Sequence, residues 1–233
     1  MTGFLPCLMF FVLGCSGALV NLGAAGSFAV LAATPSVTNT GLSIINGDVG
    51  LTPGTIVTGF PPGVVVPPFA FHVNDGSATA AKADLTSAHI AASGLTGTDL
   101  SATSNLGTQT LTPGVYTFTS SASLTGTVTL DFQGNPAAEF VFVMTSTLIT
   151  STGSRVSIVN GGNGCNVYWI VGSSATIEVG SSFEGHVLAL TDITVKTGAV
   201  IQNGSFLARN GQITLDSTSI LSTTCFVAQD GNE

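Results

Sequence analysis

The segment Thr176-Ile-Glu-Val-Gly-Ser-Ser-Phe183 is followed 18 residues later by Thr194-Val-Lys-Thr-Gly-Ala-Val-Ile201, with Thr and Gly in matching positions. A third copy, Thr214-Leu-Asp-Ser-Thr-Ser-Ile220, begins 20 residues after the second. Such self-similarity is the signature of repeat architectures. About three short strands, joined at Gly or Asn corners, use up one period. The repeat therefore predicts an all-β solenoid whose turns stack about 4.8 Å apart, because no turn buries its own apolar face.

Earlier copies of the repeat are longer. Val141-Phe-Val-Met-Thr-Ser-Thr-Leu-Ile149 matches Tyr168-Trp-Ile-Val-Gly-Ser-Ser-Ala-Thr176 at an offset of 27, which is one period plus nine residues. The loop Asn160-Gly-Gly-Asn-Gly-Cys-Asn166 accounts for this excess. A weaker copy runs from Tyr116 to Phe132. The sequence thus predicts one continuous stack of turns with a loop inserted in it.

Composition limits the possible partners. The chain has 233 residues, of which 44% are hydrophobic and only 7% are charged. A net charge of −8 with 4 Lys and Arg leaves no basic footprint for nucleic acid, and anionic membrane surfaces would repel it. The length suits one domain, or one domain plus a leader.

The amino terminus resembles a secretory signal. The apolar run from Phe4 to Leu13 is too short to span a bilayer, and Ser16-Gly-Ala18 offers small residues for cleavage. We expect residues 1–18 to be a signal peptide, residues 19–233 to be a single domain, and the protein to be secreted. The leader lacks Lys and Arg, so a lipoprotein-type box at Val12-Leu-Gly-Cys15 and an ordinary first strand remain alternatives.

Two cysteines would remain after cleavage. Cys7 and Cys15 would leave with the leader, whereas Cys165 and Cys225 stay. Export permits a disulfide between these two, although loop spacing does not prove it. Two cysteines without paired histidines give no zinc signature, so no metal or other cofactor is expected.

One segment predicts a helix instead of strands. Residues 77–93 are rich in Ala and free of Gly and Pro, with Asn74-Asp75-Gly76 as a possible start and Gly94 as the stop. A stripe of small residues falls at helical spacing, which would let the helix lie close against a wall of strands. The stripe consists of Ala81, Leu85, Ala88 and Ala92.

Several stretches resemble the DUF3494-type ice-binding protein family. They are Leu22-Gly-Ala-Ala-Gly-Ser-Phe-Ala-Val-Leu-Ala32, Ile45-Asn-Gly-Asp-Val-Gly-Leu-Thr-Pro-Gly54, Leu111-Thr-Pro-Gly-Val-Tyr-Thr-Phe118, Asn166-Val-Tyr-Trp169, Phe183-Glu-Gly185 and Lys196-Thr-Gly198. No single motif is decisive, but their order and spacing are specific and cover roughly Leu22 to Ile220.

The resemblance implies a discontinuous right-handed β-helix of triangular cross-section with one long α-helix alongside. It implies an antifreeze protein that binds ice crystal surfaces, causes thermal hysteresis and inhibits ice recrystallisation. It implies no catalysis and no cofactor, and we expect a monomer. The chain departs from the family in a short region between the first turn and the helix, where some members carry a capping insertion.

Strand alternation predicts which side chains would meet ice. If Ile193, Val195, Ile213 and Leu215 point inward, the residues between them point outward. A flat face of short side chains suits a neutral lattice, and the stiff χ1 of Thr loses little entropy on docking. The predicted ice-binding columns comprise Thr147, Ile149, Ser174, Thr176, Asp192, Thr194, Gln212 and Thr214, continued by Ser123 and Thr125.

Other interpretations remain open. Thr ladders also stabilise exposed sheets by cross-strand pairing, and the other two faces are alternative sites. Asp192, Glu178 and Asp216 could form a carboxylate cluster of the kind that β-helical polysaccharide hydrolases use, but the scarcity of basic residues argues against an enzyme. Glu178, Lys196 and Asp216 more simply predict a charged edge of the Thr face. A secreted adhesive or structural solenoid without ice activity is the main alternative function.

Overall fold

The structure, a computed structural model, describes residues 18–221 and Cys225. The predicted leader, including Cys7 and Cys15, lies outside this part except for Ala18. The described residues form two sheets, one α-helix and two short 3-10 helices. Every strand pair in them is parallel. The predicted β-rich fold with a single long helix is confirmed.

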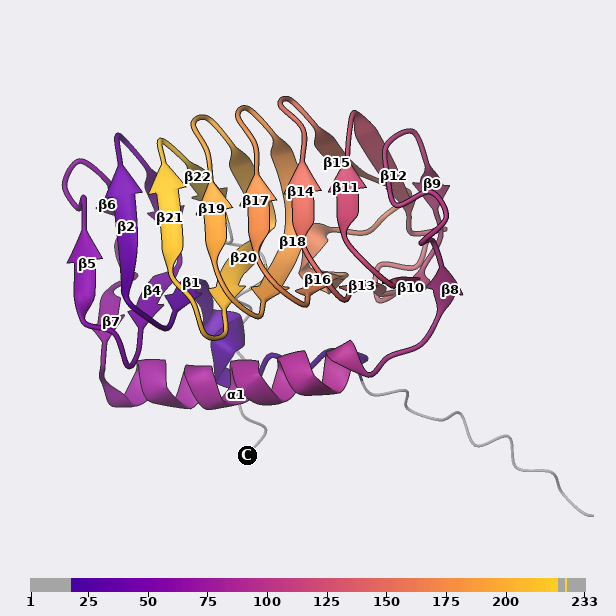
Figure 1. Ribbon diagram of the computed structural model, residues 1–233. Coiled ribbons are helices and arrows are strands. Elements are labelled where there is room, and N and C mark those ends of the chain that lie inside the picture. The colour runs from indigo at the N-terminus through magenta and orange to yellow at the C-terminus, as the bar shows by residue number, and fades with distance from the viewer. Residues whose placement is uncertain (1–17, 222–224, 226–233) are drawn as a thin grey trace, which may run out of the picture.

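The smaller sheet has seven strands, which we call the front sheet because it faces the viewer in Figure 1. Its spatial order is β11-β14-β17-β19-β21-β2-β5. The strands are β2 (Ser36–Thr40), β5 (Ile56–Thr58), β11 (Ala122–Leu124), β14 (Leu148–Thr150), β17 (Ala175–Ile177), β19 (Ile193–Val195) and β21 (Ile213–Asp216).

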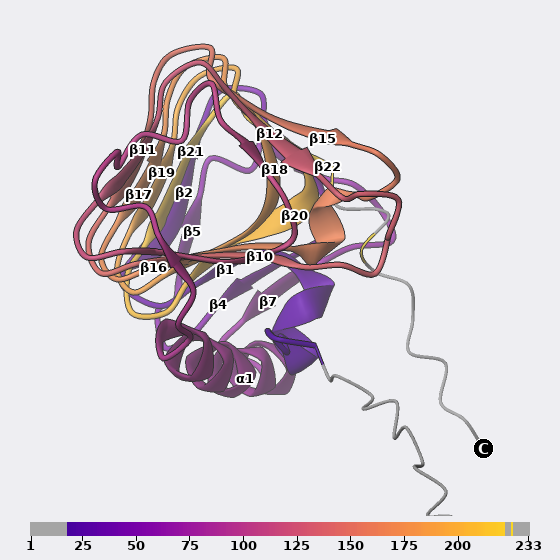
Figure 2. The ribbon, with the colours of Figure 1, turned by 90° about the vertical axis from the view of Figure 1, so that its right-hand side faces the viewer.

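The fifteen-stranded sheet covers two further sides, and the chain outlines a three-sided section in Figure 2. The helix-side face contains β1 (Phe28–Ala32), β4 (Asp48–Leu51), β7 (Phe71–Val73), β8 (Thr98–Asp99), β10 (Gly114–Phe118), β13 (Phe140–Met144) and β16 (Val167–Val171). The third face contains β3 (Ile44–Asn46), β6 (Val64–Val65), β9 (Thr110–Leu111), β12 (Thr127–Asp131), β15 (Arg155–Val159) and β22 (Ser219–Leu221).

Two long strands, β18 (Ser182–Ala189) and β20 (Val200–Ala208), belong to both faces. Their pairing shifts register between Glu184 and His186, so each strand bends from the third face to the helix-side face. Gly185 adopts a φ of 99° at this bend, and a Cβ on Gly204 would meet the Gly185 carbonyl. Glycine is therefore required where the two strands turn the corner.

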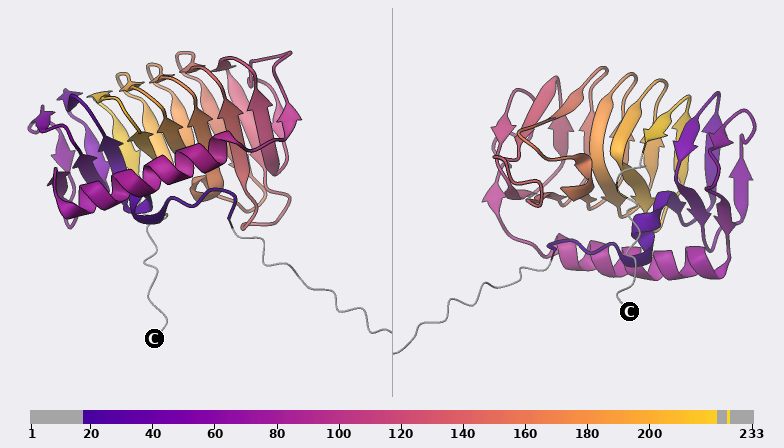
Figure 3. Two further views of the ribbon diagram at one scale, coloured as in Figure 1. Left: turned by 60° about the horizontal axis from the view of Figure 1, so that its bottom comes forward. Right: turned by 180° about the vertical axis from the view of Figure 1, so that it is seen from behind.

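The chain does not stack its turns in sequence order. The first turn, β1 and β2, lies between the last turn, β20 and β21, and the next turn, β4 and β5. After β7, the helix α1 (Gly76–Ser93) runs along the stack to the opposite end, where β8 begins (Figures 1 and 3). The later turns then stack back until they meet the first.

The interior is apolar and contains a ladder of aromatic rings. Phe142 stacks on Tyr116 and on Trp169, with ring centroids 5.4 and 4.1 Å apart. Trp169 also contacts Phe183 and donates its indole N–H to the Glu184 carbonyl at 3.0 Å. Such rings bury large apolar areas, and one from each turn joins neighbouring turns into one core.

Helix α1 follows its predicted bounds closely. The Asp75 carboxylate accepts a hydrogen bond from Ala78 N at 2.8 Å and so caps the amino terminus. The predicted small-residue stripe is buried against the helix-side face, where Leu85 packs in a cluster with Tyr168 and Leu188. The η1 turn (Gly23–Ser27) flanks the helix, and Asp84 accepts from Ala24 N at 2.7 Å. The helix-side face is thus covered by protein.

The corner between the front sheet and the third face uses a left-handed residue in each turn. These residues are Gly41, Gly59, Gly126, Gly153, Gly180, Gly198 and Ser217. The φ of Gly198 is 72°, and a Cβ there would have nothing within 4 Å. Glycine is therefore needed at this position because of its backbone conformation, and not because neighbouring atoms would clash with a side chain.

We expect Gly198→Ala to lower the free energy of unfolding by about 1–2 kcal/mol, the cost of a left-handed backbone for an L-residue. Urea unfolding measures this change. Gly76→Ala is the matched control, because Gly76 also has open space but does not have a positive φ. Equal effects of the two changes would rule out the conformational explanation.

His186 is buried on β18 and makes the stability of the fold depend on pH. Its Nδ1 lies 2.8 Å from the Ser205 hydroxyl, and burial lowers its pKa to about 4. The unfolded chain takes up a proton near pH 6.5, whereas the folded protein does not. Stability that is present above pH 6.5 is therefore lost as the pH falls toward 4.

The full loss from His186 is expected to be about 3 kcal/mol across this window. Urea unfolding at pH 7 and pH 4.5 measures it, with His186→Asn as the comparison. His89 is also buried with a lowered pKa, so both proteins retain some dependence on pH. If His186→Asn shows the same slope as the unchanged chain, the assignment to His186 is wrong.

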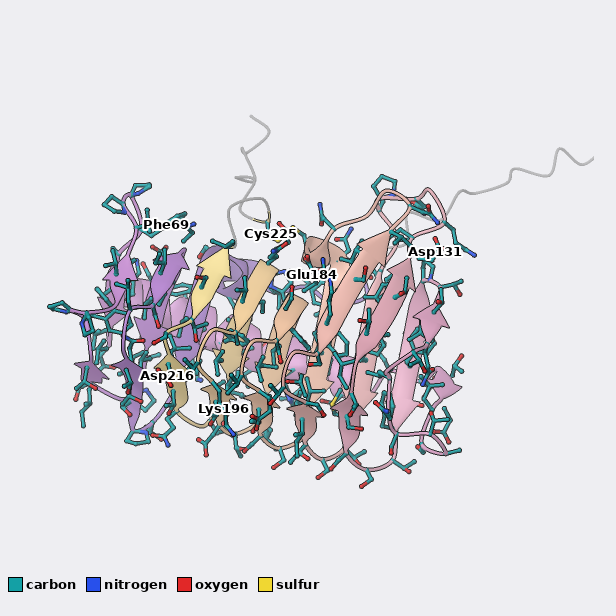
Figure 4. All side chains as sticks on the ribbon, turned by 90° about the horizontal axis from the view of Figure 1, so that it is seen from above. Phe69, Asp131, Glu184, Lys196, Asp216 and Cys225 are labelled. Atoms are coloured by element: carbon teal, nitrogen blue, oxygen red, sulfur yellow. A yellow bond between two sulfur atoms is a disulfide. The ribbon has the colours of Figure 1, made fainter. Side chains whose placement is uncertain are left out.

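A disulfide joins Cys165 to Cys225 across 60 residues. Cys165 lies in η2 (Gly164–Asn166), part of the loop between β15 and β16. The bond thus ties Cys225 to the predicted inserted loop, and Cys225 lies on the side of the molecule opposite Lys196 of the front sheet (Figure 4).

Candidate functional site

The front sheet presents three columns of outward side chains. Its inward residues are almost completely buried, among them Ala175, Ile193 and Ile213. Side chains alternate along a strand, so the residues between these point outward. The columns run across all the strands of the sheet, perpendicular to their direction, and neighbouring residues in a column come from different turns.

The middle column is uncharged and consists mainly of Thr. Cross-strand register links Ile149 to Thr176, Thr176 to Thr194, and Thr194 to Thr214. In order, the column contains Ser123, Ile149, Thr176, Thr194, Thr214, Thr38 and Thr58. Five of the seven strands, all adjacent, therefore present Thr at the same height, which gives this part of the sheet a regular ridge of methyl and hydroxyl groups.

The column toward the helix side is more polar. The Gln212 N–H donates to the Asp192 carboxylate at 2.9 Å, and Ser36 Oγ lies 3.4 Å from Gln212 Oε1. The column contains Ser121, Thr147, Ser174, Asp192, Gln212, Ser36 and Ile56. Asp192 is its one formal charge, and that carboxylate is already occupied by a backbone donor.

The third column forms the edge predicted to be charged, and that prediction is confirmed. Lys196 Nζ lies 2.6 Å from Glu178 Oε1, and Asp216 follows on the next strand. Both Lys196 and Asp216 lie in the lower half of Figure 4, on the side opposite Cys225. Exposed ion pairs of this kind contribute ~0–1 kcal/mol, so this edge is a solvated border to the Thr columns.

Two predicted site residues lie in other columns than expected. Ser123 pairs with Ile149 and not with Thr147, and Thr125 lies at the edge, where its hydroxyl is 2.9 Å from Ser151 Oγ. The prediction was therefore wrong by one alternation for this turn. Ser123 is 26 residues from its partner Ile149, whereas pairing it with Thr147 requires an offset of 24. A shift of two residues keeps the same side chains outward, so strand alternation does not detect it.

Two of the seven strands of the front sheet, β2 and β5, were not predicted to belong to it. Thr38 and Thr58 extend the middle column, and Ser36 and Ile56 extend its neighbour. Thr38 Oγ1 lies 3.3 Å from Thr214 Oγ1 although the two are 176 residues apart. The alternation of Ser36-Val-Thr-Asn-Thr40 was a possible signal, but nothing local shows that the first turn packs on the last.

The remaining faces are less suited to a flat contact. Helix α1 covers the helix-side face. The third face carries Arg155 and Asp131. Cys225, which is bonded to Cys165, lies on the same side of the molecule as Asp131 and Glu184 (Figure 4). Burial raises the pKa of Glu184 to about 7, opposed by a hydrogen bond from Asn203 Nδ2 at 3.3 Å. The front sheet is the remaining face with short, mostly uncharged side chains.

Two other kinds of site are not found within residues 18–221 and Cys225. No group of three or more His, Cys, Asp or Glu side chains is placed there to hold a metal ion. None of the helices in this part of the chain has the length and apolar character needed to cross a membrane.

The chain is similar to known proteins over most of its length. The family model described as "Ice-binding-like" matches residues 30–221. An ice-binding protein from Nostoc sp. (strain HG1) is 44% identical over 211 residues, covering 88% of this chain and 74% of the relative. The structure of an ice-binding protein from the Antarctic ascomycete Antarctomyces psychrotrophicus has a TM-score of 0.82 and 42% identity, covering 87% of this chain and 98% of that one. The structure of an ice-binding protein from an Antarctic biological consortium has a TM-score of 0.82 and 43% identity, covering 87% of this chain and 90% of that one.

Proposed function

This chain belongs to the ice-binding-like family, and we propose that it is an antifreeze protein that adsorbs to ice crystals through the front sheet. The observation that carries the site assignment is the middle column of Ser, Thr and Ile, uncharged along its whole length. Adsorbed protein would separate the freezing point from the melting point and inhibit recrystallisation.

The chemistry of the columns supports adsorption to a neutral lattice. Charged groups order their own hydration shells, whereas a Thr methyl lies beside ordered water and its hydroxyl joins a hydrogen-bond network. Each contact is weak, but a rigid sheet engages many at once, so affinity accumulates as in multivalent binding. The proposed site comprises Ser123, Ile149, Thr176, Thr194, Thr214, Thr38 and Thr58, flanked by Thr147, Ser174, Asp192 and Gln212, with Thr125 at its edge.

The architecture fits this role. We infer a discontinuous, right-handed β-solenoid of triangular section, supported by the stacking of the first turn on the last and by the outline in Figure 2. A solenoid supplies the flat, repeating surface that a crystal plane requires, because each turn repeats the one below it.

Processing, export and assembly of the protein are also part of the proposal. We propose that residues 1–18 are removed on secretion and that residues 19–233 act as one monomeric domain without catalytic activity or cofactor. A disulfide between Cys165 and Cys225 supports export, since such bonds persist in oxidising compartments.

Growth of a single ice crystal in a solution of the fluorescently labelled protein tests adsorption directly. We expect the label to be incorporated into the ice on particular planes and to stay after the crystal is washed. A labelled variant with Thr194→Tyr should be excluded from the ice. Ice that excludes the unchanged protein would contradict the proposal and favour an adhesive or structural solenoid.

A further inference from the structure

Two of the four basic side chains of the protein lie together beside helix α1. Lys82 Nζ donates to the Ala208 carbonyl at 2.6 Å, at the end of β20. Arg209 is the next residue, at the corner between the helix-side face and the front sheet. His89 lies two helical turns beyond Lys82, with Nε2 3.1 Å from the Val171 carbonyl. We call Lys82, His89 and Arg209 the basic seam.

Acidic partners are missing from the basic seam within the described part of the chain. No carboxylate oxygen in that part of the chain lies within 4.0 Å of a charged nitrogen of Lys82 or Arg209. Two carboxylates on neighbouring elements accept hydrogen bonds from other groups: Asp84 accepts from Ala24 N and Asp192 accepts from Gln212 N. This is unexpected in a chain with 12 acidic residues and a net charge of −8.

Arg209 also has an unused buried donor. Its Nε is shielded from solvent and has no hydrogen-bond partner in the described structure. A buried donor without a partner is costly, and native proteins rarely leave one unpaired unless water or a ligand satisfies it. The guanidinium plane presents its remaining donors as a fork that suits a carboxylate or phosphate group.

The groups of the basic seam also disfavour one another's charge. Burial, and then repulsion by Arg209, lower the pKa of Lys82 to about 7. The pKa of His89 is lowered by burial and by Arg209, against the opposing effect of the Val171 carbonyl. An anion placed among these groups would relieve the repulsion and favour the charged ammonium.

We propose that the basic seam binds an oxyanion, held by the Arg209 guanidinium and the Lys82 ammonium. The ligand is either a free phosphate-like ion or a carboxylate group of an anionic polysaccharide, since both offer the same oxygens to the same donors. Binding draws a proton onto Lys82, so it is coupled to proton uptake near neutral pH.

Calorimetry of the whole secreted chain tests the proposal. Sodium phosphate and, separately, sodium alginate are titrated at constant ionic strength and pH 7.5. We expect the Tm to rise by about 3 °C at ten times the Kd, with uptake of a fraction of a proton measured in two buffers of different ionisation enthalpy. Arg209→Gln and Lys82→Met should abolish the rise, while Arg155→Gln, which removes an exposed arginine from β15, should keep it.

The outcomes separate the two sources of the anion. A response to phosphate assigns the basic seam to a free ion, and a response to alginate alone assigns it to a polymer. No rise with either ligand, or an equal rise in Arg209→Gln and in the unchanged protein, overturns the proposal. If the variants do not fold, the pKa of the Lys82 ammonium is followed by NMR in the unchanged protein, and a value that neither ligand raises overturns it equally.

Discussion

Replacement of Thr194 by Tyr is expected to remove most of the ice-binding activity while the fold stays intact. Thr194 lies in the middle column, between Thr176 and Thr214 on the adjacent strands. A tyrosine ring would stand above these neighbours and hold the sheet away from a flat lattice. Loss of even one contact worth about 1.4 kcal/mol lowers affinity tenfold, and the ring would separate several contacts at once.

Thermal hysteresis measured at equal concentration compares Thr194→Tyr with Thr129→Tyr. Thr129 is the matched control, because it also lies in the middle of a strand, β12, but on the third face. Both variants should keep the circular-dichroism spectrum of the unchanged protein, and only Thr194→Tyr should lose activity. A folded Thr194→Tyr protein with full hysteresis would show that ice binds to another face.

Loss of the disulfide is expected to be the largest single change in stability. The bond closes a loop of 60 residues that contains much of the repeat. Restricting a loop of this length in the unfolded chain stabilises the folded state by about 4 kcal/mol. The double change Cys165→Ser with Cys225→Ser should therefore lower the free energy of unfolding by about that amount, measured in urea on a chain beginning at Leu19.

Reduction provides the control for this effect. Dithiothreitol should bring the unchanged protein to the stability of the double variant and should leave the variant as it was. Ice activity at low temperature should survive in both, because the bond lies away from the front sheet. A reductant that does not alter the urea midpoint of the unchanged protein would contradict the expected contribution.

The sequence predicted the elements that are specified locally. Helix α1 was found because Ala-rich sequence, a capping Asp75 and a terminal Gly94 all act within a few residues of one another. The columns from Thr147 to Thr214 were found because the inward residues alternate regularly and successive turns differ in length only by one loop. These signals need no knowledge of distant contacts.

The parts that were missed depend on contacts between distant segments. No local pattern shows that Thr38 lies beside Thr214, since that contact requires the helix to return the chain along the whole stack. The position of Thr125 was wrong because a shift of two residues along a strand keeps the same side chains outward, so alternation in a weak repeat does not detect it. The basic seam was missed because Lys82 and Arg209 are far apart in the sequence and meet only when the helix packs on the strands.

Nanolitre osmometry on the purified protein tests the central claim most directly, by comparing the freezing and melting points of a single ice crystal. If the front sheet adsorbs to ice, freezing will lie below melting by a measurable gap that grows with protein concentration, and the crystal will develop facets. Coincident freezing and melting points, together with a round and unshaped crystal, would contradict ice binding by this protein.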